Sequence, residues 1–159
     1  MEKNERKVTV YMMIGFPGAG KDTWIKKNLP DLPSVSRDDI RAELGFCGNN
    51  DKVVLTPAQE NIVTGIFNSR LLDCVKNGQD VVINNINIRR RYRNDFKKLL
   101  APYDVKWVYV VVEAPDLDTN KKRREGQIPS EVMDRVAAKF EPPTPDEYDE
   151  IIYDKQTKI

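Results

Sequence analysis

A glycine-rich stretch, GFPGAGKDT, follows directly after an apolar run, VTVYMMI, near the start of the chain. Residues 15–21 match the pattern G-x-x-x-x-G-K, in which backbone N–H groups turn inward around an anion and the lysine reaches the outer phosphates. The apolar run at 8–14 predicts a strand before the loop. The segment at 21–29 predicts a helix, whose N-terminal dipole adds to anion binding. This context predicts a nucleotide-binding loop rather than a surface turn, with contacts from Gly15, Pro17, Gly18, Ala19, Gly20, Lys21, Asp22 and Thr23.

One position departs from the usual loop. Ser or Thr normally follows the lysine, and its hydroxyl binds the Mg²⁺ that bridges the phosphates, whereas this chain has Asp22. Asp22 can hold the metal directly or through water, although it adds negative charge beside a polyphosphate. Alternatively Thr23 supplies the hydroxyl, which resembles the G-K-G-T loop of adenylate-kinase-like enzymes. We expect ATP, or another nucleoside triphosphate, and Mg²⁺ in either case, with Asp22 and Thr23 as the candidate metal ligands.

The composition limits the chemistry. The chain has 159 residues, 40% of them hydrophobic and 32% charged, which predicts a single domain over 1–159. Histidine is absent, so Ser-His and Cys-His nucleophilic mechanisms are excluded and a proton acceptor must be a carboxylate or a lysine. No apolar run approaches the ~20 residues that span a membrane, and residues 1–7 are charged without a signal-type apolar core behind them. We therefore expect a cytoplasmic protein without a membrane partner.

Hydrophobic patterning predicts strands that alternate with helices. We expect strands at 8–14, 34–36, 81–83, 105–112 and 150–153, and helices at about 21–29, 37–44, 57–77, 88–100 and 130–140. Ser36 is a predicted N-cap, and Thr56, Pro57 and Gln59 predict a capping box with proline in the first turn. This order of elements predicts an α/β fold, a parallel sheet of about five strands with helices on both faces.

Charge is unevenly distributed, although the formal net charge is only +1. Residues 89–98 carry six basic side chains against one acid, whereas the acidic C-terminal tail, 141–159, carries six acids against two lysines. This pattern predicts a localised positive surface. The arginines around Tyr92 are either a solvated helix face or a track of phosphate contacts and stacking for a single strand. Arg90 and Arg91 are the candidate phosphate contacts.

The segment SRDDIR, residues 36–41, stands where the second predicted strand ends. Ligands of open α/β sheets bind at the carboxyl ends of strands, and Asp38 and Arg41 are three apart on one helix face. Kinases need a carboxylate that accepts the hydroxyl proton and an arginine that holds an anion. Asp38 and Arg41 are therefore candidates for these roles. The alternative is that Asp38 and Asp39 only stabilise the helix dipole and that Arg41 is solvated.

A family resemblance rests on four pieces in the same order and at similar spacing. GFPGAGKDTW (15–24), SRDDIR (36–41), IVTGIF (62–67) and VVINNIN (81–87) resemble the kinase domain of bacteriophage polynucleotide 5′-kinase. The likeness extends to about residue 140. It implies a P-loop kinase fold, with a Walker A loop and a small basic lid at about 116–128.

The resemblance also implies roles for individual residues. Asp38 would be the general base for a 5′-hydroxyl, Arg41 would hold the acceptor's phosphate, and Lys21 would stabilise the transferred phosphoryl group. The implied lid arginine is Arg123 or Arg124, because the local alignment is ambiguous by one residue.

The third strand departs from the family. The family places an acid and then Thr-Asn after this strand, whereas this chain has Asn85, Ile86 and Asn87, which retains the last asparagine and loses the carboxylate. Asn85 and Asn87 are candidate substrate contacts. The phosphatase domain that follows the kinase in the best-known phage enzyme is missing, so we expect no phosphate-removing activity.

The expected function is transfer of the γ-phosphate of ATP, or another nucleoside triphosphate, to the 5′-hydroxyl end of DNA or RNA. The expected partner is single-stranded or nicked nucleic acid under repair, in the host cytoplasm if the chain is phage-encoded. Two alternatives stay open. One is a P-loop kinase for a small acceptor such as a nucleoside, a sugar acid or an antibiotic. The other is a nucleotide-binding module without transfer activity, which Asp22 and Asn85 suggest.

Overall fold

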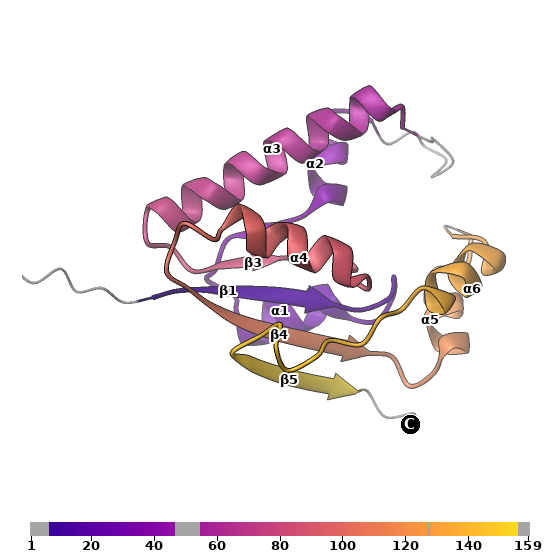
Figure 1. Cartoon of the computed structure of the whole chain (residues 1–159). Helices are drawn as coiled ribbons and strands as arrows, with labels where there is room; N and C mark the ends of the chain where they lie inside the picture. Colours follow the sequence, from indigo (N-terminus) through magenta and orange to yellow (C-terminus); the bar gives the residue numbers. More distant parts are fainter. Residues whose placement is uncertain (1–6, 47–54, 127, 156–159) are drawn as a thin grey trace, which may run out of the picture.

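The computed structural model describes residues 7–46, 55–126 and 128–155, which form a five-stranded sheet flanked by helices (Figure 1). The strands are β1 (Val8–Ile14), β2 (Ser34–Val35), β3 (Val81–Ile83), β4 (Val105–Glu113) and β5 (Glu150–Lys155). The helices are α1 (Lys21–Asn28), α2 (Arg37–Glu43), α3 (Pro57–Lys76), α4 (Arg90–Leu99), α5 (Leu117–Arg123) and α6 (Ser130–Ala138).

The sheet is entirely parallel, in the order β2-β3-β1-β4-β5. All three residues of β3 are buried, as are six consecutive residues of β4, because helices cover both faces of a parallel sheet. The predicted α/β fold with about five parallel strands is confirmed. All strands point the same way, so their carboxyl ends meet at one edge, and α5 and α6 lie beyond that edge (Figure 1).

The two faces of the sheet are covered unequally. Helices α3 and α4 cover one face, where Phe67 and Phe96 pack with their ring centroids 5.3 Å apart. Helix α1 covers the other face through Ile25, which packs with Val108 and Val110 of β4. The side chains that α3 buries recur every four residues, the spacing of one helix face: Val63, Phe67, Leu71 and Val75.

The two predicted N-caps are present and fix the starts of α2 and α3. Thr56 and Gln59 form a reciprocal capping box, with Pro57 in the first turn of α3. The Ser36 hydroxyl accepts a hydrogen bond from the Asp39 N–H at 3.4 Å. These caps hold the first turns of both helices at the carboxyl edge of the sheet.

A buried ion pair joins α4 to the acidic C-terminal segment. Arg93 is fully buried, and its Nε donates to Glu147 Oε1 at 2.8 Å. Its second terminal nitrogen donates to the Glu141 carbonyl at 2.9 Å. Arg90 Nε lies 3.5 Å from Glu147 Oε2, and Lys97 donates to the Glu147 carbonyl at 2.7 Å. The positive surface is therefore smaller than the charge pattern predicts, because acids of the tail are paired with the basic helix.

No helix in the described ranges is both long and apolar enough to cross a membrane.

Candidate active site

The loop between β1 and α1 has the backbone that the sequence pattern predicts. A Cβ atom on Gly15 would lie 2.7 Å from the Val112 carbonyl oxygen, so only glycine fits against β4 here. Gly18 and Gly20 have φ values of 78° and 104°, a left-handed conformation that glycine adopts at little cost. The Gly15 N–H donates to the Ile86 carbonyl at 3.0 Å, which ties the loop to the segment after β3.

Lys21, the first residue of α1, directs its ammonium back to the start of the loop. Its ammonium donates to the carbonyl oxygens of Gly15 at 2.9 Å and Phe16 at 3.2 Å. The pKa of Lys21 is lowered to about 8, chiefly by burial and also by Arg124, against the opposing effects of Asp22 and Asp38. A bound phosphate would compete with the two carbonyls for this ammonium.

Helix α5 packs directly on the loop. The Asn120 side chain is buried and donates to the Pro17 carbonyl at 3.1 Å, and Arg123 donates to the Gly18 carbonyl at 2.9 Å. Arg124 directly follows α5, and its Cγ lies 3.3 Å from where a Cβ atom on Gly18 would stand. Arg123, the last residue of α5, and Arg124 therefore both lie at the phosphate-binding loop.

A cleft of about 870 Å³ extends from the loop to α2 and the end of β3. It brings together most of the residues that the sequence singles out. The predicted site residues on its walls are Pro17, Gly18, Gly20, Lys21, Asp22, Thr23, Asp38, Arg41, Asn85, Arg123 and Arg124.

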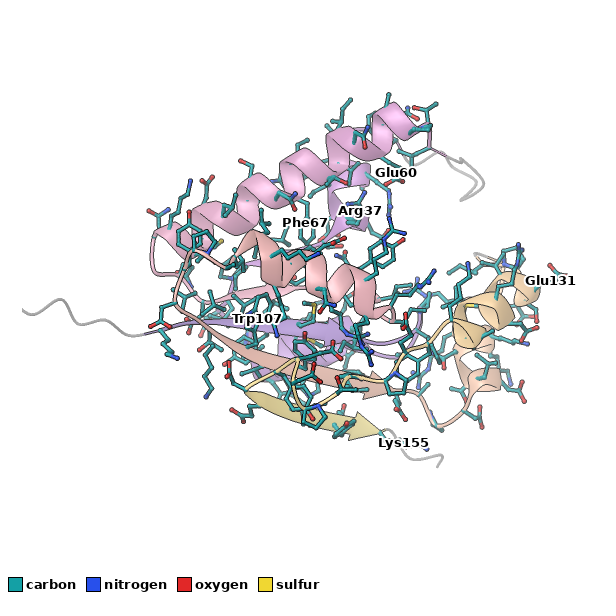
Figure 2. The ribbon with its side chains drawn as sticks, viewed as in Figure 1. Arg37, Glu60, Phe67, Trp107, Glu131 and Lys155 are labelled. Carbon is teal, nitrogen blue, oxygen red and sulfur yellow. The ribbon has the colours of Figure 1, made fainter. Side chains whose placement is uncertain are left out.

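Asp38 and Arg41 belong to a network of charges between α2 and α3. Arg41 donates to Asp38 Oδ1 at 2.7 Å, which confirms that the two share one helix face, and its other terminal nitrogen lies 3.2 Å from Glu60 Oε1. Arg37 donates to Glu60 Oε2 at 2.6 Å, and Figure 2 shows these two side chains meeting between the helices. The Asp38 side chain is 91% exposed, so its carboxylate is open to the cleft.

Glu60 is a site residue that the sequence does not reveal, because its partners lie 19 and 23 positions away on another helix. Burial acts to raise the pKa of Glu60, but the hydrogen bonds from Arg37 and Arg41 outweigh it and hold that pKa below its ordinary value. The charged carboxylate fixes both arginines at the wall of the cleft.

The asparagines after β3 differ in their surroundings. Asn84 Nδ2 donates to Asp22 Oδ1 at 2.7 Å, and Asn85 Oδ1 accepts from the Arg37 N–H at 3.0 Å. Asn87 is only 4% exposed, and its side chain donates to the Met13 carbonyl at 2.7 Å. The Nδ2 group of Asn87 therefore holds the end of β1, and a substrate contact by Asn87 stays a prediction.

A second cavity, of about 930 Å³, lies between α3 and α4 and shares Arg37, Arg41, Asn85 and Ile86 with the first. Apart from Glu60, the other charged and aromatic side chains that line it are those of Arg89, Lys98, Lys139, Asp95, Tyr92 and Phe96. Basic side chains thus outnumber the one acid among them.

Arg90 and Arg91 are not among the residues that line either cavity. Arg90 is directed to Glu147, and the Arg91 guanidinium lies 5.7 Å from the Tyr92 ring centroid. Arg89 is the arginine of this cluster that faces the second cavity. The sequence alone does not show which of these arginines faces the cavity, because they are nearly consecutive and do not follow the spacing of one helix face.

The oxygen donors beside the loop suit Mg²⁺. The Asp22 carboxylate, the Thr23 hydroxyl and the Asn84 amide are hard ligands on one cleft wall. Within the described residues, no group of three or more His, Cys, Asp or Glu side chains is placed to hold a metal ion. A cation here would take its remaining ligands from phosphate oxygens and water, as Mg²⁺ at nucleotide sites does.

Comparison with known proteins places this geometry in a family. A family model described as an AAA domain matches residues 10–143. Among solved structures, one chain of the Pnkp1/Rnl/Hen1 RNA repair complex superposes with a TM-score of 0.71 at 20% identity, over 87% of this chain and 46% of that one. This chain thus spans less than half the length of that relative.

Two further structures match over nearly the whole chain. A protein of Chloroflexus aurantiacus J-10-fl has a TM-score of 0.71 at 13% identity, over 96% of this chain and 90% of that one. A gluconokinase of Sinorhizobium meliloti 1021 has a TM-score of 0.63 at 15% identity, over 97% and 86%. At these identities the similarity shows the fold, which is that of the P-loop kinases.

Proposed function

This chain belongs to the AAA domain family, and on that premise we propose that it is a polynucleotide kinase. It transfers the γ-phosphoryl group of a nucleoside triphosphate to the 5′-hydroxyl end of a nucleic acid. The phosphate-binding loop with Lys21 takes the triphosphate, and Arg123 and Arg124 act as the lid. The acceptor end lies beside Asp38 and Arg41.

The second cavity is the observation that carries the choice of acceptor. It opens from the charge network at Arg41, and its volume of about 930 Å³ extends well past the reacting hydroxyl. Arg89 and Lys98 line this cavity and would contact backbone phosphates, although Arg89 Nε also lies 3.6 Å from Glu141 Oε1. The Tyr92 ring, which is 50% exposed, offers a stacking surface for a base. A small acceptor has no use for cationic and aromatic contacts this far from the reacting atom.

The chemistry follows from the arrangement of charges. Asp38 accepts the proton of the 5′-hydroxyl while the hydroxyl oxygen forms a bond to the γ-phosphorus. At the same time the bond between the γ-phosphorus and the β–γ bridging oxygen breaks, and the nucleoside diphosphate leaves. Lys21 and the lid arginines stabilise charge on the transferred group. Bound Mg²⁺, with Asp22 and Thr23 as its protein ligands, would neutralise charge on the phosphate oxygens.

The competing proposal is a kinase for a small acceptor. The similarity to a gluconokinase over 97% of this chain favours it, and so does the low net charge. A chain of an RNA repair complex among the structural neighbours favours nucleic acid.

One assay separates these proposals. γ-Labelled ATP and Mg²⁺ are offered to 5′-hydroxyl DNA and RNA oligonucleotides, to nucleosides and to gluconate, with 5′-phosphorylated oligonucleotides as the negative control. We expect label on the 5′-hydroxyl oligonucleotides, and a loss of at least ~100-fold in Lys21→Ala. Label on gluconate or nucleosides alone would favour the small-acceptor kinase, and the absence of any transfer would favour a binding module.

A further inference from the structure

Asp22 and Asn84 form a hydrogen-bonded pair where the loop meets the sheet. Asp22 is the second residue of α1, and Asn84 directly follows β3, the parallel neighbour of β1. The Asn84 amide donates to Asp22 Oδ1 at 2.7 Å, and both side chains line the cleft. In the usual loop a hydroxyl takes the place of Asp22, and a carboxylate follows a neighbouring strand, both directed at the metal. In the family that this chain resembles, that acid aligns with Asn85, the residue after Asn84.

In this chain the carboxylate stands on the loop side, and both residues directly after β3, Asn84 and Asn85, are neutral. The pair still contains a single negative charge, but that charge now stands next to Lys21, within the segment that binds the phosphates. The amide cannot replace the carboxylate as an anion. The Asn84 amide can orient the Asp22 carboxylate, because its N–H₂ group donates a hydrogen bond to one carboxylate oxygen.

The cleft wall carries three carboxylates besides its five basic side chains, those of Lys21, Arg37, Arg41, Arg123 and Arg124. Asp22, Asp38 and Asp39 all line it. Burial raises the pKa of Asp39, and Asp22 and Asp38 raise it further, which places all three carboxylates within electrostatic reach of one another. Burial lowers the pKa of Lys21 to about 8, so its ammonium is charged at neutral pH and that charge is lost as the pH rises above 8. A free polyphosphate that enters this loop therefore meets a carboxylate beside its binding amides.

We infer that Asp22 makes nucleotide binding conditional on a divalent cation: the loop accepts the Mg²⁺ complex of a nucleotide and rejects the free anion. This rests on the proposed function, since it requires that the loop binds nucleotide. When a divalent cation lies between them, Asp22 and the phosphates are both attracted to the cation. This attraction outweighs the repulsion between the two anionic groups. Asn84 is the positioning residue that presents the carboxylate.

The test is calorimetric binding of ADP to the intact chain, in Mg²⁺ and in EDTA, which requires no turnover. For the wild type we expect affinity to be about 100-fold higher with Mg²⁺, the order that one unit charge produces over several ångströms at an effective dielectric constant of about 20. Asp22→Asn keeps the shape and removes the charge. It should strengthen binding of metal-free ADP and reduce the Mg²⁺-to-EDTA affinity ratio by at least about tenfold.

Three further variants sharpen the test. Asp22→Ser restores the usual loop residue and should reduce the ratio as Asp22→Asn does. The exchange Asp22→Ser with Asn85→Asp returns the carboxylate to the strand side, so metal-free ADP should bind more tightly than to the wild type. Asp73→Asn removes an exposed acid of α3 outside both cavities and should leave both affinities unchanged. Thermal unfolding of each variant shows that it is folded.

The outcomes separate the two proposals. Equal wild-type affinities in Mg²⁺ and EDTA, or an unchanged ratio in both Asp22 variants, would overturn this inference and leave the kinase assignment standing. Failure of the folded wild type to bind ADP under either condition would overturn the proposed function and this inference together.

Discussion

At the scale of single residues, Lys21 gives the site a pH dependence. Its pKa is lowered to about 8, chiefly by burial, whereas a bound polyphosphate favours the charged form. The ammonium is therefore fully charged in the empty loop only below about pH 7. As the pH rises through 8 the empty loop loses its charge, so nucleotide binding must then take up a proton.

We expect the affinity for Mg²⁺-nucleotide to be constant below about pH 7 and to fall by up to tenfold per pH unit above 8. Calorimetry at pH 8.5 in two buffers of different ionisation enthalpy measures the proton uptake. Lys21→Arg is the matched control, since its guanidinium stays charged and should take up none. Binding by the wild type without proton uptake at pH 8.5 would contradict this assignment.

Asp38 and Asp39 are adjacent acids with separable roles. A positioned carboxylate base contributes about 10²–10⁴-fold, so Asp38→Asn should reduce kcat by that order and leave the Kd for nucleotide nearly unchanged. Asp39→Asn should change helix stability by less than about 1 kcal/mol, through the dipole of α2, with a smaller effect on kcat. Steady-state kinetics and urea unfolding of both variants measure the difference. Equal effects on kcat would favour the view that both acids only stabilise the helix.

At the scale of elements, the buried Arg93–Glu147 pair ties α4 to the C-terminal segment. Removing one partner of a buried ion pair costs about 3–5 kcal/mol, because the other charge is left without compensation. We expect Arg93→Met and Glu147→Gln each to lower the free energy of unfolding in urea by that amount. The double substitution Arg93→Met with Glu147→Leu should cost much less than the sum. Arg91→Met, on the exposed side of the same helix, is the control and should stay within about 0.5 kcal/mol.

These contacts mark what the sequence could predict and what it could not. The loop, the caps at Ser36 and Thr56 and the order of strands and helices are local signals, written within a few residues of one another. The partners of Arg93 and Glu60 are tertiary, and Glu147 lies 54 positions after Arg93. Charge composition alone therefore predicted a broader basic surface than the fold leaves. The pairing of Asn84 with Asp22, 62 positions apart, was hidden for the same reason.

At the scale of the whole molecule, the second cavity predicts how acceptor binding responds to salt. If Arg89 and Lys98 contact acceptor phosphates, KM for a 5′-hydroxyl oligonucleotide should rise steeply with added salt, while KM for nucleotide changes less. Arg89→Gln with Lys98→Gln should reduce the slope of log KM against log salt by about 1–2. Arg90→Gln with Arg91→Gln is the matched neutralisation of residues outside the cavities and should change it less. A KM independent of salt would argue for an uncharged, small acceptor.

A chain of hydrogen bonds runs from Glu147 through Arg93 and Asn87 to the end of β1. We expect it to affect the order in which the segments of the chain fold during synthesis. Arg93 donates to the Asn87 carbonyl at 3.0 Å, and the Asn87 amide holds the Met13 carbonyl, just ahead of the loop. The loop is synthesised early, but the acid that neutralises Arg93 emerges only after residue 147. Until then the nascent chain carries an arginine that its apolar interior cannot accept without the charge of Glu147, so we expect α4 not to pack on the sheet. We therefore expect the loop at 15–21, although it is synthesised early, to be among the last segments to reach its folded conformation.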